Sequence, residues 1–245
     1  MKTHPARLAI FFLLLGVTLL LAQSASQFTK ANQEFASGDF KAAIADYEEM
    51  VRAGEDAPNL FYNLGNAYFR QKDLGRAILN YERALALDPR HPEAQANLRI
   101  ARDEARALEL IPNRWERWLV LTSADQYAVG ATIAFWIVVF ALVIFILDRR
   151  RAALALAILS ILICAFAIFA AYQSEHGNKG SGLAVVITAN AEARIATADT
   201  ANRVLTLPAG SEIRILSRRG DWIYAALPNN LRGWMPEVSA EPVRM

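Results

Sequence analysis

Two long apolar runs dominate the hydrophobic pattern of the chain. Residues 128–147 and 152–172 hold 20 and 21 residues without a charge, about the length that an α-helix needs to cross the hydrocarbon core of a bilayer. Because lipid offers no hydrogen bonds to an exposed backbone, such runs are expected to be helical. A buried helix pair of a soluble protein is the alternative, but soluble helices of this length normally carry a polar face. The pattern therefore predicts transmembrane helices over 127–147 and 152–172.

The turn between these runs, residues 148–151, reads Asp-Arg-Arg-Arg. Three adjacent arginines could form a binding patch or a cleavage site. Short loops rich in Lys and Arg are, however, typical of the cytoplasmic side of a membrane. We therefore interpret Arg149, Arg150 and Arg151 as a topological marker. They predict a cytoplasmic turn, with the chain on both sides of the hairpin outside the cytoplasm.

The N-terminus, residues 1–24, has the pattern of a secretory signal peptide. Lys2 and Arg7 precede an apolar stretch over 8–22, and small residues around Ser24 resemble a cleavage site. An uncleaved membrane anchor is the alternative. Both interpretations place residue 25 onward across the membrane, in agreement with the arginine turn.

Small residues recur at alternating spacings of four and three along the second apolar run. This spacing places them on one helix face, where a second helix can approach closely. Their partner is either the first apolar helix or another protein, although an alanine-rich segment also gives such a stripe by chance. The residues are Ala153, Ala157, Ser160, Cys164, Ala167 and Ala171.

Aromatic and basic residues mark the segment before the first span, residues 111–126. Trp115 and Trp118 alternate with Arg114 and Arg117, a combination suited to the membrane–water interface. The pattern predicts a short amphipathic segment on the outer leaflet, with an ordinary connector as the alternative.

Between the signal and the first span, the sequence repeats itself after 34 residues. The shift superposes 24–57 on 58–91, and the matched pairs include Phe35 with Phe69, Asp39 with Asp73, and Tyr47 with Tyr81. This period is the length of the tetratricopeptide repeat, and the second unit, "NLFYNLGNAYFRQKDLGRAILNYERALALDP", resembles that family. The resemblance implies two helix-pair repeats over 25–91 and one capping helix over 92–110. Because roughly three repeats are usually needed for stability, we expect a partner or the membrane surface to complete the array.

The same resemblance implies a peptide-binding groove on the concave face of the array. Asparagine side chains there can hold an extended backbone by donating and accepting together. Phe28 and Glu93 stand where carboxylate-clamping relatives use lysine, so capture of a C-terminal carboxylate is not expected. Burial of the aromatic residues between helices is the alternative. The predicted groove residues are Asn32, Phe35, Tyr62, Asn63, Asn66, Phe69, Arg70 and Asn97.

The pattern changes from helical to strand-like after residues 173–182, a stretch rich in Gly and Ser that predicts a flexible linker. Five short strands separated by turns indicate a small barrel over 183–241. The order of its Gly, Asp and Trp residues resembles the bacterial SH3 family. Trp222, Tyr224 and Trp234 form either an aromatic binding surface or part of the barrel core.

Composition narrows the classes of function. Lys and Arg (26) nearly balance Asp and Glu (24), for a net charge of +2, so nothing favours nucleic acid as a partner. Cys164 is the single cysteine, and the three histidines are scattered without metal-ligand spacing. No nucleophile, base and orienting group come together in the sequence. We therefore expect no enzyme, no cofactor and no metal.

The order of these parts resembles the BatE proteins of aerotolerance (Bat) operons. The fold expected is that of a multidomain membrane protein with an all-α tetratricopeptide array, a two-helix transmembrane hairpin and a small all-β SH3-like barrel. The resemblance implies work beside membrane proteins with von Willebrand factor A domains and a MoxR-type ATPase. We expect a non-enzymatic scaffold in the bacterial inner membrane, with both soluble domains in the periplasm. The alternative is a peptidoglycan tether that acts through the SH3-like domain.

Overall fold

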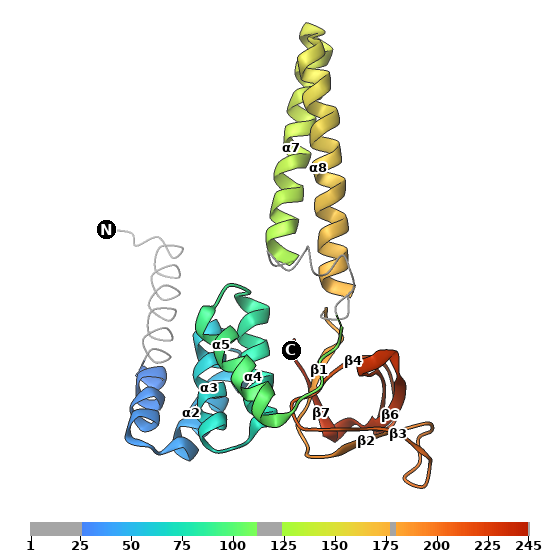
Figure 1. Ribbon diagram of the computed structural model, residues 1–245. Helices are drawn as coiled ribbons and strands as arrows, with labels where there is room; N and C mark the ends of the chain where they lie inside the picture. The colour runs from blue at the N-terminus through green and yellow to red at the C-terminus, as the bar shows by residue number, and fades with distance from the viewer. Residues whose placement is uncertain (1–25, 112–123, 177–179, 245) are drawn as a thin grey trace, which may run out of the picture.

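The computed structural model describes residues 26–111, 124–176 and 180–244. The predicted signal peptide, 1–24, and most of the predicted interfacial segment, 111–126, lie outside these residues. The described chain forms a helical array, a long helical hairpin and a small β-domain over 180–244 (Figure 1). The predicted fold class is therefore confirmed.

The helical array contains five helices: residues 26–37, α2 (Phe40–Arg52), α3 (Pro58–Arg70), α4 (Leu74–Leu87) and α5 (Pro92–Ala105). Repeated residues start repeated helices. Asp39 Oδ1 accepts from Ala42 N at 3.1 Å, and Asp73 Oδ1 accepts from Arg76 N at 3.1 Å. Each carboxylate satisfies a backbone N–H that the first turn of a helix leaves without a partner. The 34-residue period thus fixes where α2 and α4 begin.

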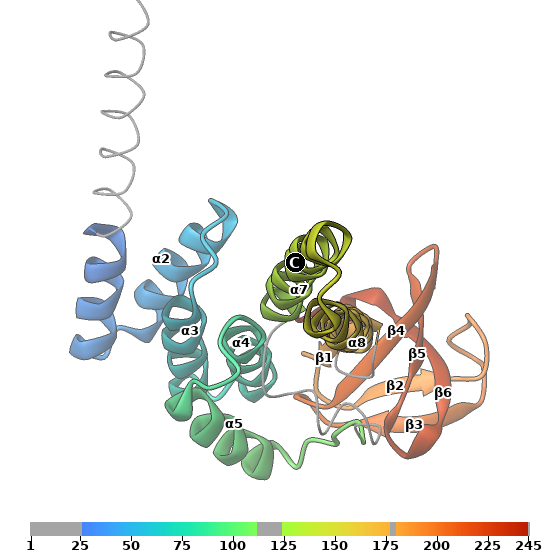
Figure 2. The same ribbon diagram turned by 90° about the horizontal axis from the view of Figure 1, so that it is seen from above.

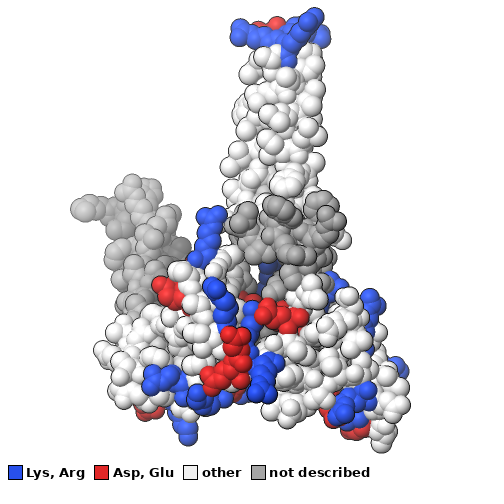
Figure 3. All heavy atoms as spheres, in the orientation of Figure 1, with Lys and Arg blue, Asp and Glu red and all other residues white. Residues whose placement is uncertain are grey.

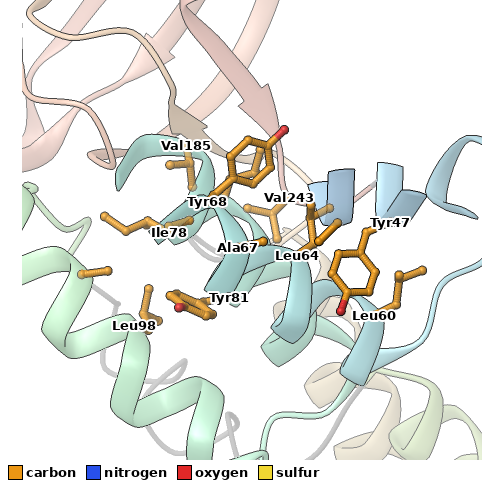
Figure 4. Packing of buried hydrophobic residues seen from close by; sticks show 14 of the residues in the cluster. Tyr47, Leu60, Leu64, Ala67, Tyr68, Ile78, Tyr81, Leu98, Val185 and Val243 are labelled. Atoms are coloured by element: carbon orange, nitrogen blue, oxygen red, sulfur yellow. The ribbon is translucent and has the colours of Figure 1, made fainter. Parts of the chain in front are cut away.

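Close contact between helices explains the small residues of the repeat. A Cβ atom added to Gly65 of α3 would lie 2.7 Å from the ring of Tyr81 in α4, so only glycine lets this aromatic ring pack against the helix backbone. Tyr81 and its counterpart Tyr47 are both 1% exposed. Figure 4 shows both rings in the core of the array, with Leu64 and Ala67 between them.

The β-domain is a curved antiparallel sheet of seven strands, two more than predicted. Its strand order is β3-β2-β6-β5-β4-β1-β7. The additional strands include ones of four and three residues, which are too short to show an alternating pattern in the sequence. The strands are β1 (Leu183–Val186), β2 (Ala191–Arg194), β3 (Arg203–Leu207), β4 (Glu212–Arg219), β5 (Trp222–Ala226), β6 (Arg232–Pro236) and β7 (Ala240–Pro242).

The β-domain packs directly on the array and completes it. Leu183, Val185 and Val243 belong to the same buried cluster as the array core, and Figure 4 shows Val185 and Val243 among the side chains of the array. The backbone of Ile187 lies so close to α4 that a Cβ atom on Gly75 would approach its carbonyl oxygen to 2.9 Å. We expected a partner or the membrane to cover the short array; instead, another part of the same chain covers α4.

The segment after α5 forms a second part of this interface. The predicted capping helix over 92–110 is shorter than expected: it ends at Ala105, and Arg106 adopts a left-handed conformation with φ 52°. The chain then runs beside the start of β4, where Leu108 O accepts from Glu212 N at 2.8 Å and Leu110 N donates to Glu212 Oε2 at 3.0 Å. Figure 2 shows α4 and α5 on the side of the array that faces the strands.

The hairpin consists of α7 (Ala124–Asp148) and α8 (Arg151–His176), and both helices are long and apolar enough to span a membrane. The second begins one residue earlier and ends four residues later than predicted, so that it enters the predicted linker over 173–182. The three arginines lie at the turn beside Asp148, and Figure 3 shows these charged side chains at the tip of a hairpin whose described surface is otherwise uncharged on this face. Large aliphatic and aromatic side chains cover the outside of both helices.

The small residues of α8 lie against α7. Ala153, Ala157, Ser160 and Ala167 are at most 8% exposed, and Ala134 and Ala141 of α7 are buried as well. Cys164 Sγ approaches Ala131 O at 3.6 Å. At the end of the stripe, Ala170 rather than Ala171 is fully buried. The structure therefore gives this face the first apolar helix as its partner.

Candidate functional site

A hollow of about 240 Å³ lies on the face of the array formed by residues 26–37, α3 and α5. Five of the eight predicted groove residues line it: Phe35, Asn66, Phe69, Arg70 and Asn97. Tyr81 and Ile100 complete the lining. We call this hollow the concave groove. Because its walls come from both repeats and from α5, it exists only when the helices are stacked.

Asn66 is fixed at the centre of the concave groove by two hydrogen bonds. Its Oδ1 accepts from the Tyr81 hydroxyl at 2.8 Å and from Asn97 Nδ2 at 2.8 Å. Tyr81 belongs to α4 and Asn97 to α5, so one amide oxygen joins three helices. The Nδ2 group of Asn66 remains as its donor toward a ligand.

The same arrangement occurs one repeat earlier. Asn32 Oδ1 accepts from the Tyr47 hydroxyl at 2.6 Å and from Asn63 Nδ2 at 2.9 Å. Each of these residues precedes its counterpart by 34 positions, so the sequence repeat extends to a repeated hydrogen-bonded triad. Because their amide oxygens are occupied, Asn32 and Asn66 present donors rather than the donor–acceptor pair that we expected, whereas Asn63 and Asn97 use their amide nitrogens in these bonds.

Burial keeps the tyrosines of these triads protonated. It raises the pKa of Tyr47 to about 12 and raises the pKa of Tyr81 in the same direction. A neutral hydroxyl is the form that donates to an asparagine oxygen. The triads therefore persist across the physiological pH range and hold the asparagine amides in one orientation.

An apolar wall faces these amides. Phe35 packs edge-on against Phe40 with ring centroids 5.3 Å apart, and the guanidinium of Arg70 lies 4.5 Å above the Phe40 ring. Ile100, which the sequence analysis missed, is 55% exposed. It shares its face of α5 with Asn97, Asp103 and Glu104, and an aliphatic residue among these polar ones is the signal that could have found it. The wall offers a place for one apolar side chain of a ligand.

Tyr62 supports the concave groove from its edge. Its ring lies 4.9 Å from that of His91 and 6.2 Å from that of Tyr81. Its hydroxyl accepts from Asn97 Nδ2 at 3.4 Å. Tyr62 therefore positions Asn97 and does not line the hollow itself.

The three aromatic residues of the β-domain lie on its outer face. Along β5 and β6 the buried residues Ile223, Ala225 and Met235 alternate with half-exposed ones. Tyr224 pairs with Trp234 across the strands, and their ring centroids are 5.0 Å apart. Trp222 stands opposite Pro236. This face is separate from the edge of the sheet that packs on the array, which is formed by β1 and β7.

Within the residues that the structure describes, no three His, Cys, Asp or Glu side chains come together as metal ligands. A search of curated proteins finds no match to this chain. The family model for the tetratricopeptide repeat matches residues 28–92, which include the whole first triad and Asn66 and Tyr81 of the second.

Proposed function

We propose that the protein is a non-enzymatic membrane scaffold whose concave groove binds an extended segment of a partner protein. The observation that carries the proposal is the fixed orientation of Asn66 and Asn32, whose amide N–H groups accompany an apolar wall. An extended peptide presents backbone carbonyl groups that accept from such donors, and its side chains alternate between the two sides. One apolar side chain would occupy the space beside Phe69 and Ile100.

The fold supports one orientation of the two soluble parts. The array precedes the hairpin, the β-domain follows it, and the two share a buried core. Parts that share a core lie on the same side of a membrane, which two spans allow. A cytoplasmic arginine turn then places both parts outside the cytoplasm. This agrees with a scaffold in the bacterial inner membrane with both domains in the periplasm.

The order of array, hairpin and SH3-like β-domain remains our reason to propose a BatE-like role. In such a role, the partners would be membrane proteins with von Willebrand factor A domains, and a MoxR-type ATPase would belong to the same system. A cytoplasmic ATPase would reach this chain only at the arginine turn, because the remainder of the described chain is in the membrane or beyond it.

Site-specific photocrosslinking in native membranes tests the groove. A photoreactive phenylalanine at position 100 replaces the exposed Ile100 within the concave groove, and one at position 87 replaces the exposed Leu87 outside it. We expect a partner protein to crosslink at position 100 and not at position 87. Addition of Asn66→Ala should abolish the crosslink at position 100. Equal crosslinking at both positions would show that the groove is not the binding surface.

A second candidate function is a peptidoglycan tether. It is favoured by the half-exposed stack of Tyr224 and Trp234, because flat aromatic faces offer a large apolar contact area to a ligand. Full-length protein in detergent should co-sediment with purified sacculi, and Trp234→Ala should abolish this while Phe69→Ala should not. If wild-type protein stays in the supernatant, the tether is excluded. The full chain is required because the β-domain shares its core with the array.

A further inference from the structure

Arg70 is the only charged residue among the described residues that line the concave groove. Its side chain is exposed, and its guanidinium lies 4.5 Å above the Phe40 ring. No carboxylate of the described chain lies within ion-pair distance of this guanidinium. An aromatic ring attracts a cation but does not neutralise it. The concave groove therefore holds one exposed cation that the described chain leaves without an anionic partner.

The acidic residues of α5 at repeat-equivalent positions do not compensate Arg70. Glu104 stands one period after Arg70, and its carboxylate pairs with Lys72 at 2.9 Å. Asp103 stands one period after Phe69, but it does not line the concave groove. A ligand that enters the groove therefore meets a positive charge and no negative one among the residues that line it.

The cation and the apolar wall share one small space. Phe35, Phe69 and Ile100 line the same hollow as Arg70, and its volume is about 240 Å³. This is below the roughly 300–1,000 Å³ of sites for drug-sized ligands, so the hollow suits one or two side chains of a longer segment. An apolar side chain and an anionic one would both find a matching surface there.

The spacing of the two binding elements along α3 matches an extended peptide. Asn66 and Arg70 are one helical turn apart, which is about 6 Å along the axis. In an extended segment, side chains two positions apart point to the same side and lie about 6.5–7 Å apart. Two side chains that enter one hollow from an extended segment are therefore two positions apart.

Given the peptide-binding function proposed above, we infer that the partner's segment is acidic, with an Asp or Glu two positions from an apolar residue. The carboxylate pairs with Arg70, whose planar guanidinium can donate two parallel hydrogen bonds to it. The apolar side chain contacts Phe69 and Ile100, and a backbone carbonyl accepts from Asn66 Nδ2. A lysine in place of the acidic residue would bring a second cation beside Arg70, so basic segments are excluded from the groove.

Three peptides with blocked ends test the charge preference. STETLTETS carries a glutamate two positions away on each side of its leucine, and its Gln and Lys versions replace both glutamates. Full-length protein in phosphatidylcholine nanodiscs, with labelled Ile methyl groups, is titrated with each peptide. We expect saturable shifts of the Ile100 signal, with the Glu peptide about fivefold tighter than the Gln peptide and the Lys peptide weakest. At about 0.5 M salt these differences should shrink, because an exposed ion pair is screened.

Variants assign the preference to Arg70. Arg70→Glu should reverse the order of the three affinities, and Arg70→Gln should make them equal. Arg232→Glu makes the same change in net charge at an exposed position of β6, and it should keep the wild-type order. Equal affinities of the Glu and Gln peptides for the wild-type protein would overturn the acidic segment but leave the peptide groove intact. If no peptide moves the Ile100 signal, the peptide-binding function is contradicted as well.

Discussion

The guanidinium of Arg102 donates to the carboxylate of Glu212, 110 residues further along the chain. Arg102 lies in α5, before the hairpin, and the fully buried Glu212 begins β4, after it. Glu82 binds the same guanidinium. Burial acts to lower the pKa of Arg102, but Glu82, Glu212 and Glu109 outweigh it and raise the pKa. The array and the β-domain are thus joined by a buried charge cluster as well as by an apolar core.

Replacement of Arg102 should weaken the contact between the array and the β-domain. Arg102→Met leaves two buried carboxylates without their cation, and loss of one partner of a buried ion pair costs about 3–5 kcal/mol. The free energy of unfolding of the full chain in detergent should fall by that amount. Lys72→Met is the matched control, because it breaks the exposed pair with Glu104, for which at most about 1 kcal/mol is expected. Similar losses in both variants would contradict the role given to Arg102.

The contact between α4 and the β-domain can be tested with a single methyl group. Gly75→Ala would place its Cβ 2.9 Å from Ile187 O, a backbone atom that cannot rotate away. Overpacking of this kind costs about 1–3 kcal/mol, so a lower melting temperature is expected. Gly130→Ala adds the same methyl group where nothing lies within 4 Å, and it should leave the melting temperature unchanged or raise it.

The two hydrogen-bonded triads should contribute equally to stability. Tyr47→Phe and Tyr81→Phe each remove one hydroxyl that donates to an asparagine oxygen, and each should cost about 1 kcal/mol. Tyr224→Phe, on the outer face of the β-domain, should cost less. In addition, Tyr81→Phe should weaken binding of the groove partner, because Asn66 loses one of its two restraints. A normal affinity in that variant would show that the amide orientation is irrelevant.

Stability should decrease in alkaline solution. The pKa of Tyr47 rises from 10.0 to about 12 on folding, chiefly because the ring is buried. Because the folded state binds this proton more tightly than the unfolded state, the hydroxyl contributes fully to the free energy of unfolding below pH 10. That contribution is lost as pH rises through 12. Denaturant titrations between pH 9 and 12 should show this fall, and Tyr47→Phe should make it shallower. A flat profile in the wild-type protein would contradict the raised pKa.

The proposed membrane topology predicts which positions an impermeant reagent reaches. In a Cys164→Ala background, single cysteines replace the exposed Gln71, Val238 and Arg150. Intact cells should be labelled at positions 71 and 238, and position 150 should react only after the membrane is opened. Because the array and the β-domain share a core, opposite accessibility at 71 and 238 is incompatible with the fold. Labelling at 150 alone would reverse the orientation of the whole protein.

Features that depend on local periodicity could be predicted from the sequence. The two long apolar helices follow from runs of uncharged residues, and the positions of α2 and α4 follow from a repeat that places Asp39 and Asp73 at equivalent helix starts. Most of the concave groove could also be predicted, because residues one repeat apart occupy equivalent places. Ile100 was missed because the residues one and two periods before it, Asn66 and Asn32, are polar, so the pattern does not mark an apolar residue there.

The sequence by itself determined the parts of this protein: a repeat array, a long apolar hairpin and a strand-rich domain, each encoded by contacts within its own segment. Only the tertiary structure decided how the parts meet. The cover that Val185 and Val243 provide for the array and the bond between Arg102 and Glu212 both join residues separated by the entire hairpin. No periodic pattern records such contacts, because they depend on the shapes and charges of two surfaces that form separately.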